Sequence, residues 1–132
     1  MPAASQTALQ LLDLAELRRT RALLRHEVSQ ATHWRRIIQA RLDLTVARAV
    51  LPARLGLEIT DQVSPEALST IPAFADLLGI ARRPGDSFPV DDLLRLRAAE
   101  RSLGEYEAHV RRALMAATDA LVERLEAVRA VP

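Results

Sequence analysis

Apolar residues recur at alternating steps of three and four along the first third of the chain, and this pattern predicts a long helix. Because such steps keep side chains on one helical face, they predict a heptad seam that packs against a partner helix. Ser5 is a suitable N-cap and Pro52 a suitable stop, so we expect the helix to run from about Gln6 to Leu51. Two of the seam residues are arginines. The full seam is Leu14, Leu17, Arg21, Leu24, Val28, Ala31, Arg35, Ile38, Leu42, Thr45 and Ala49.

A second stretch, from about Pro89 to Val128, repeats the pattern and predicts the partner helix. Its seam is Leu96, Ala99, Leu103, Tyr106, Val110, Ala113, Ala117, Leu121 and Leu125. The connector between them, residues 52–88, is marked by proline and glycine. It predicts one short helix in "SPEALS", capped by Ser64, another in "PAFADLLG", ended by Gly79, and a loop in "RRPGDS". The expected fold is all-α: a single domain, 1–132, forming an antiparallel helical hairpin (a coiled coil) closed by small helices.

Composition narrows the function. The net charge is only +1, so the whole molecule is not expected to bind DNA. Every one of the 18 basic residues is arginine. The charge is nonetheless uneven, because residues 21–50 carry +4 and residues 51–80 carry −3. There is no cysteine, no signal pattern, and no run approaching the roughly 18 apolar residues that span a bilayer. We therefore expect a cytoplasmic protein without a membrane segment.

A stripe of polar residues lies directly beside the first seam. Thr32, Arg35, Gln39 and Asp43 fall within about 80° of arc at about 100° per residue. One interpretation is the solvated flank of a coiled coil, where Arg and Asp are ordinary residues. The other is a binding site whose groups are held at fixed spacing by the helix. Geometry alone leaves both open.

The order of these residues resembles a known motif. T-x-x-R-x-x-x-Q-x-x-x-D, within "THWRRIIQARLD", is similar to the nucleotide-binding motif of the RsiG family of anti-sigma factors, also called aerial mycelium formation proteins, from actinobacteria. That motif is E-x-x-x-S-x-x-R-x-x-x-Q-x-x-x-D, so Thr32 stands for its Ser and Val28 for its Glu. The connector "VSPEALSTIPAFADLL" also resembles the family's apolar link. A degenerate second motif in "GEYEAHVRRALMAATDAL" keeps only Arg111 and Asp119; alignment on Glu107 instead keeps that acid and loses nearly everything downstream.

The resemblance implies a ligand and a partner. The family's coiled coil binds cyclic di-GMP and thereby holds a sigma factor of the WhiG type. The implied ligand residues are Thr32, Arg35, Gln39 and Asp43, with Arg111 and Asp119 as a second motif. An Arg can bind the O6 and N7 of guanine, and an Asp can accept from its N–H groups. The alternatives are a nucleotide-independent member of the family and a plain coiled-coil assembly module, including a homodimer.

Other candidate chemistry is weak. His26, His33 and His109 are not spaced as metal ligands, so no metal site is expected. Trp34 is better explained by packing or by anchoring a partner than by a cofactor. Asp91 and Asp92 suit the first turn of the last helix. No nucleophile, base and orienting group belong together, so we expect a binding protein and not an enzyme.

Superposing the centres of the two motifs predicts the register of the hairpin. Ile38 would then lie near Ala113, Leu42 near His109 or Val110, and Ala31 near Ala120 or Leu121. In this register residues 6–20 extend beyond the last helix and are left to contact a sigma factor or a second copy.

Overall fold

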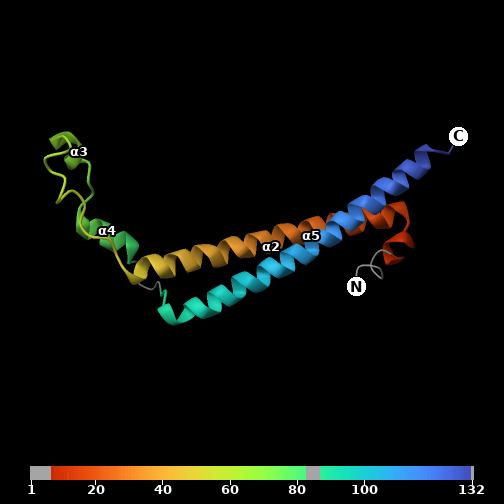
Figure 1. Cartoon of the computed structure of the whole chain (residues 1–132), viewed down its shortest axis with the longest axis horizontal. Helices are drawn as coiled ribbons and strands as arrows, with labels where there is room; N and C mark the ends of the chain where they lie inside the picture. Colours follow the sequence, from red (N-terminus) through yellow and green to blue (C-terminus); the bar gives the residue numbers. More distant parts are fainter. Residues whose placement is uncertain (1–6, 83–86, 132) are drawn as a thin grey trace.

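A computed structural model describes residues 7–82 and 87–131, and every regular element in these ranges is helical. Helix α2 (Leu14–Ala49) and helix α5 (Leu93–Arg129) lie side by side and pack against each other (Figure 1), and a 3-10 turn, η1 (Val90–Asp92), leads into α5. The two run in opposite directions, so the predicted all-α helical hairpin is confirmed. No helix in the described ranges is long and apolar enough to cross a membrane.

The first long helix begins later than predicted. Residues 7–10 are helical, but the chain leaves the helix at 11–13 and α2 starts at Leu14. A capping box causes the restart: the Glu16 backbone N–H donates to Asp13 Oδ1 and the Asp13 N–H donates to Glu16 Oε2, both at 2.8 Å. The predicted N-cap, Ser5, lies outside the described residues. At the other end the helix stops at Ala49, close to the expected Leu51.

The predicted register is wrong. It placed residue 119 opposite Thr32, whereas the Thr32 hydroxyl donates to Glu107 at 3.1 Å, twelve residues earlier in α5. Farther along the hairpin, the Arg21 guanidinium donates to the Thr118 hydroxyl at 3.2 Å, which fits the same offset. The error came from superposing two motif copies of which the second is degenerate. Ile38, Leu42 and Ala31 therefore do not face the residues that the motif centres implied.

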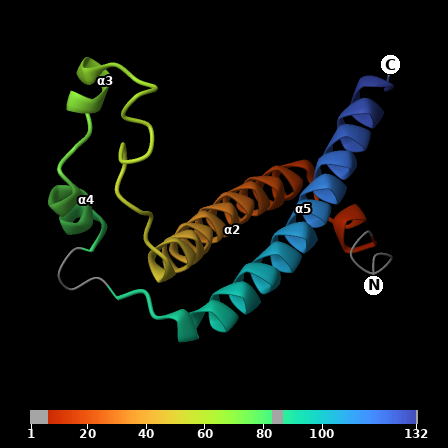
Figure 2. The same cartoon turned by 60° about the vertical axis from the view of Figure 1, so that its left-hand side comes forward.

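The change in register removes the predicted N-terminal overhang. Leu17 is completely buried, and residues 7–12 fold back along α5, where the Arg124 guanidinium donates to the Gln10 carbonyl at 3.2 Å. Leu9 lines hollows on α5 together with Ala116 and Ala120. The exposed apolar end is instead the last turns of α5, which extend past α2 (Figure 2).

The seam of α2 matches the prediction, because all its members but Ala49 are buried or half-buried. The seam of α5 departs from it at Tyr106, Ala113 and Leu125, which are exposed. After Leu103 the buried and half-buried positions continue at Glu107, Val110, Leu114 and Ala117, so a carboxylate occupies the place expected for the tyrosine. That carboxylate faces an arginine in the opposite seam, and the two polar groups therefore compensate each other inside the interface.

The connector contains the expected short helices. Helix α3 (Pro65–Ser69) is capped by the Ser64 hydroxyl, as predicted. Helix α4 (Phe74–Ala81) continues past Gly79, so the glycine does not end it. Part of the predicted loop lies outside the described residues. Both helices project from one end of the hairpin (Figures 1 and 2). That end is closed by Phe88, whose ring centroid lies 4.7 Å from the guanidinium carbons of Arg41 and Arg48.

Candidate functional site

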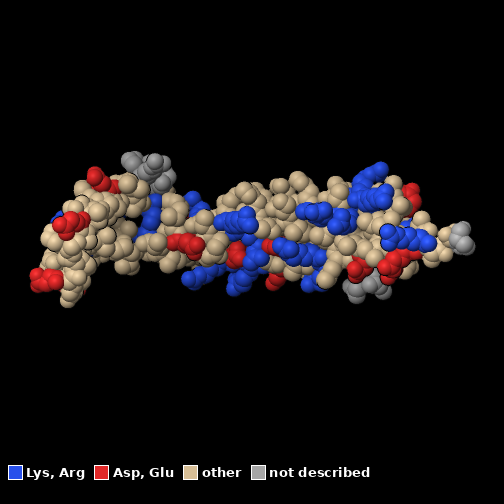
Figure 3. All heavy atoms as spheres, turned by 90° about the horizontal axis from the view of Figure 1, so that it is seen from above, with Lys and Arg blue, Asp and Glu red and all other residues tan. Residues whose placement is uncertain are grey.

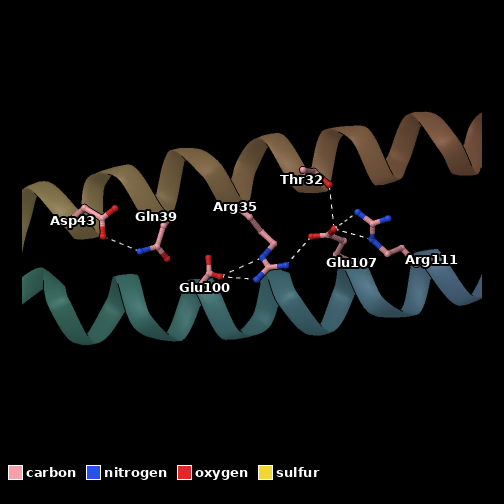
Figure 4. Close-up of polar contacts among 7 residues, drawn as sticks. All are labelled: Thr32, Arg35, Gln39, Asp43, Glu100, Glu107 and Arg111. Carbon is pink, nitrogen blue, oxygen red and sulfur yellow. Dashed lines mark hydrogen bonds and ion pairs between the residues drawn. The ribbon is translucent and has the colours of Figure 1, made fainter.

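The polar stripe of α2 lies along the groove between the two long helices (Figure 4). Its members come from successive turns, since three- and four-residue steps return a side chain to the same side of a helix. Across the groove, α5 contributes Glu100, Glu107 and Arg111. The stripe divides into two parts with different partners: Thr32 and Arg35 contact α5, and Gln39 and Asp43 contact each other.

Arg35 is the centre of the first part. Its Nη1 donates to Glu107 Oε2 at 2.9 Å, its Nη2 donates to Glu100 Oε1 at 2.8 Å, and its Nε reaches the same Glu100 oxygen at 3.3 Å. Gly104 lies beside the guanidinium, and a Cβ built there would make an ordinary contact of 3.6 Å with Arg35 Nη2. All three nitrogens of the guanidinium are thus directed at carboxylates of α5.

Glu107 joins three polar side chains inside the interface. It accepts from Arg35, from Thr32, and from Arg111 at 2.6 Å, and its own side chain is only 8% exposed. Arg35 foremost, then Arg111 and Thr32, lower the pKa of Glu107 to about 2 against the opposing effect of burial. The carboxylate is therefore held ionised at the seam.

We expect Glu107 to make the hairpin acid-sensitive. The pKa of Glu107 in the folded chain lies below its ordinary value near 4.5, so the ionised carboxylate stabilises the fold. This contribution is complete above about pH 4.5 and is lost as the pH falls from there towards 2. Thermal unfolding followed by circular dichroism should show a midpoint that drops over this window. Glu107→Gln should drop distinctly less, whereas Glu105→Gln, which alters an exposed acid nearby, should behave like the parent. Equal pH profiles for the parent and Glu107→Gln would contradict this role.

The second part of the stripe is open to solvent. Gln39 Nε2 donates to Asp43 Oδ1 at 2.9 Å, and both side chains are exposed. This pair presents a carboxylate and a primary amide on the surface, the groups that recognise the N–H and carbonyl edges of a purine. A ligand could use either residue without disturbing the packing of the two helices.

The residues of the second motif are separated in the structure. Arg111 donates to Glu107 and so joins the cluster of polar side chains around that carboxylate. Asp119 instead lies beside the N-terminal segment, where it lines a hollow with Leu9, Gln10 and Glu123. Val28, at the position of the family's Glu, is buried in the seam. Glu27, its neighbour, accepts from the Tyr106 hydroxyl at 2.6 Å, which raises the pKa of that tyrosine.

Sequence reasoning did not assign Glu100 or Glu107 a role beside the stripe. A signal for them was present: an arginine within an apolar seam requires a compensating group in the partner seam. Glu107 lies four residues after Leu103, one of the two steps that keep a residue on the seam. Among the described residues, no cluster of three or more metal-binding side chains occurs.

Comparisons with protein families, with curated proteins and with solved structures found no match to this chain.

Proposed function

We propose that this chain is an RsiG-like anti-sigma factor: a helical hairpin that binds a WhiG-type sigma factor, with cyclic di-GMP held against the polar stripe of α2. The observation that carries the proposal is the stripe itself, whose four residues keep the order of the family motif and line one groove. By holding the sigma factor's helices, the hairpin would keep them from polymerase and promoter. In this proposal the protein acts by binding, in the cytoplasm, and catalyses no reaction.

The residues fit the nucleotide in part. Asp43 can accept from the ring and amino N–H groups of a guanine, and Gln39 can serve the base or a phosphate. Arg111, whose side chain is 57% exposed, can face a phosphate while still bonded to Glu107. Arg35 is already paired with two carboxylates, so the base must compete with Glu100 or Glu107 for it. The proposed site therefore relies first on Gln39 and Asp43.

The pairing of Arg35 favours a second candidate. In a nucleotide-independent member of the family, Arg35 would serve only to join α2 to α5, and the sigma factor would be recognised by protein contacts alone. A plain coiled-coil assembly module would use the same ion pairs. Neither alternative needs cyclic di-GMP, so measurements of nucleotide and sigma factor binding distinguish both from the first candidate.

A fluorescently labelled cyclic di-GMP titrated against the chain, first alone and then with a WhiG-type sigma factor, distinguishes the candidates. The proposal expects saturable nucleotide binding that tightens when the sigma factor is present, since two ligands of one state must reinforce each other. Sigma factor binding without any effect of nucleotide would favour the nucleotide-independent candidate. Absence of sigma factor binding under both conditions would contradict the anti-sigma function.

Asp43→Ala and Gln39→Ala should each weaken nucleotide binding by about 1–3 kcal/mol, the usual contribution of a good base contact. Both side chains are exposed and, among the described residues, hydrogen-bonded only to each other, so the melting temperature should stay close to that of the parent. The matched control is Asp119→Ala, which removes an exposed acid outside the cluster. If Asp43→Ala and Asp119→Ala both bind the nucleotide as tightly as the parent, Asp43 does not belong to the site.

A further inference from the structure

The connector forms an arm, residues 50–82, on which several large apolar side chains are exposed. Helices α3 and α4 project from the hairpin, with no extensive packing on either long helix (Figure 2). Leu55 and Leu57 are 61% and 68% exposed, and Ile59 and Ile80 are exposed as well. Soluble proteins seldom leave so many large apolar side chains together in solvent unless the surface binds something.

The exposed apolar surface of the arm includes a cleft at its base. Its volume is about 280 Å³, and almost all of its lining is apolar. The lining residues come from the segment after α2 and from one face of α4: Leu51, Pro52, Ala53, Leu55, Phe74, Leu77, Leu78 and Ala81. Small-molecule sites usually place a few polar groups that orient the ligand, and this cleft presents almost none. The cleft therefore suits an apolar or aromatic side chain of a protein.

The charge of the arm indicates the kind of surface that it can bind. The arm contains four acids and two arginines, Arg54 and Arg82, which gives it a net charge of −2, and Arg54 stacks on Phe74 at 5.0 Å. The long helices carry the opposite excess: α2 contains eight arginines and three acids. Figure 3 shows acidic groups over the arm and arginines spread along the hairpin. A basic helix with exposed apolar side chains would complement the arm in both respects.

Such a helix face exists in the same chain. Leu23, Trp34, Ile37 and Leu44 are exposed on α2 and fall within about 80° of arc; we call them the outer stripe. Arg19 lies on the same arc, together with Arg41 and Arg48, whose guanidinium groups also stack on Phe88. Trp34, the single tryptophan, is 55% exposed. Aromatic and arginine side chains are the residues most often found at the energetic centre of protein interfaces.

We propose that the arm of one copy binds the outer stripe of α2 in a second copy, with Trp34 entering the apolar cleft. The arm and the stripe of one molecule are both exposed, so neither covers the other. Both surfaces belong to one chain with a net charge of only +1, so self-association meets little overall repulsion. The proposal does not depend on nucleotide or sigma factor binding.

The association is tested on the full chain by sedimentation equilibrium together with Trp34 fluorescence. We expect a reversible, concentration-dependent dimer and a blue shift of the emission over the same concentration range. Trp34→Ala and Leu55→Glu should each raise the dissociation constant at least tenfold. Asp61→Arg, which reverses an exposed charge on the arm, should also raise it. Leu94→Glu, at an exposed leucine of α5 outside both surfaces, should leave it unchanged.

Mixing two variants tests the pairing itself. Trp34→Ala keeps an intact arm and Leu55→Glu keeps an intact stripe, so an equimolar mixture should associate more tightly than either variant alone. If the stripe instead pairs with a second stripe, Leu55→Glu will dimerise like the parent, and the proposal is overturned. A chain that stays monomeric with unshifted emission up to high micromolar concentration overturns it as well.

Discussion

Leu17→Ala should lower the free energy of unfolding by about 2–4 kcal/mol, the cost of deleting a fully buried leucine side chain. Leu17 is completely buried in the first turn after the capping box. It lies there because the register and the break at Asp13 bring the start of α2 onto α5. Equilibrium urea denaturation followed by circular dichroism measures the change.

Leu23→Ala is the matched control for this prediction. It truncates the same side chain at a position of α2 that is 65% exposed, so its cost should be much smaller. If Leu17→Ala and Leu23→Ala cost the same small amount, the start of α2 does not belong to the core. The first turns of α2 would then extend beyond α5 without packing on it, as the register taken from the centres of the two motifs predicts.

Glu107→Ala should destabilise the hairpin by about 1–3 kcal/mol, because it removes the acceptor shared by Arg35, Arg111 and Thr32. Fully buried ion pairs cost more when broken, but Arg35 is 39% exposed and water reaches part of this one. Urea denaturation of Glu107→Ala beside Glu105→Ala, an exposed acid on the same helix, measures the difference. The Glu105 variant should unfold like the parent.

Arg35→Ala should act in the same direction as Glu107→Ala, because it leaves Glu107 with less compensation and removes the bonds to Glu100. Since the two residues share a contact, the double variant should cost less than the two single effects combined. Arg36→Ala, which alters the exposed neighbouring arginine, should have little effect. Fully additive effects would mean that the ion pair across the groove contributes nothing.

The positions of the helices could be predicted from the sequence because burial imposes a period on it. The α2 seam was predicted almost completely, and α3 was predicted from a serine cap followed by proline. The start of α2 was missed although "DLAE" contains the capping-box signature, since the apolar pattern continues upstream through Leu9 and Leu12. A break in the helix that leaves the apolar side chains facing the same partner does not interrupt the apolar period. Periodicity alone therefore does not reveal it.

The register and the partners of Arg35 depend on contacts between distant segments, which a local pattern does not contain. Leu and Ala repeat along both seams, so several registers bury similar apolar area. The ion pairs of Arg35 and the hydrogen bond of Arg21 with Thr118 distinguish among them. Apolar character marks a seam in the sequence, and it favours Tyr106 over Glu107. The stripe residues predicted on α2 therefore lie along the groove, whereas the structure alone shows that Glu100 and Glu107 of α5 are their partners. Their binding of a ligand stays a prediction.

In vitro transcription by core polymerase and a WhiG-type sigma factor tests the proposed function most directly. Adding the chain should lower the yield of transcript from a promoter that needs this sigma factor, and cyclic di-GMP should lower the amount of chain required. Asp43→Ala should reduce that effect of the nucleotide, and transcription with a different sigma factor should be unaffected. Undiminished transcription at an excess of chain, with or without cyclic di-GMP, would contradict the account.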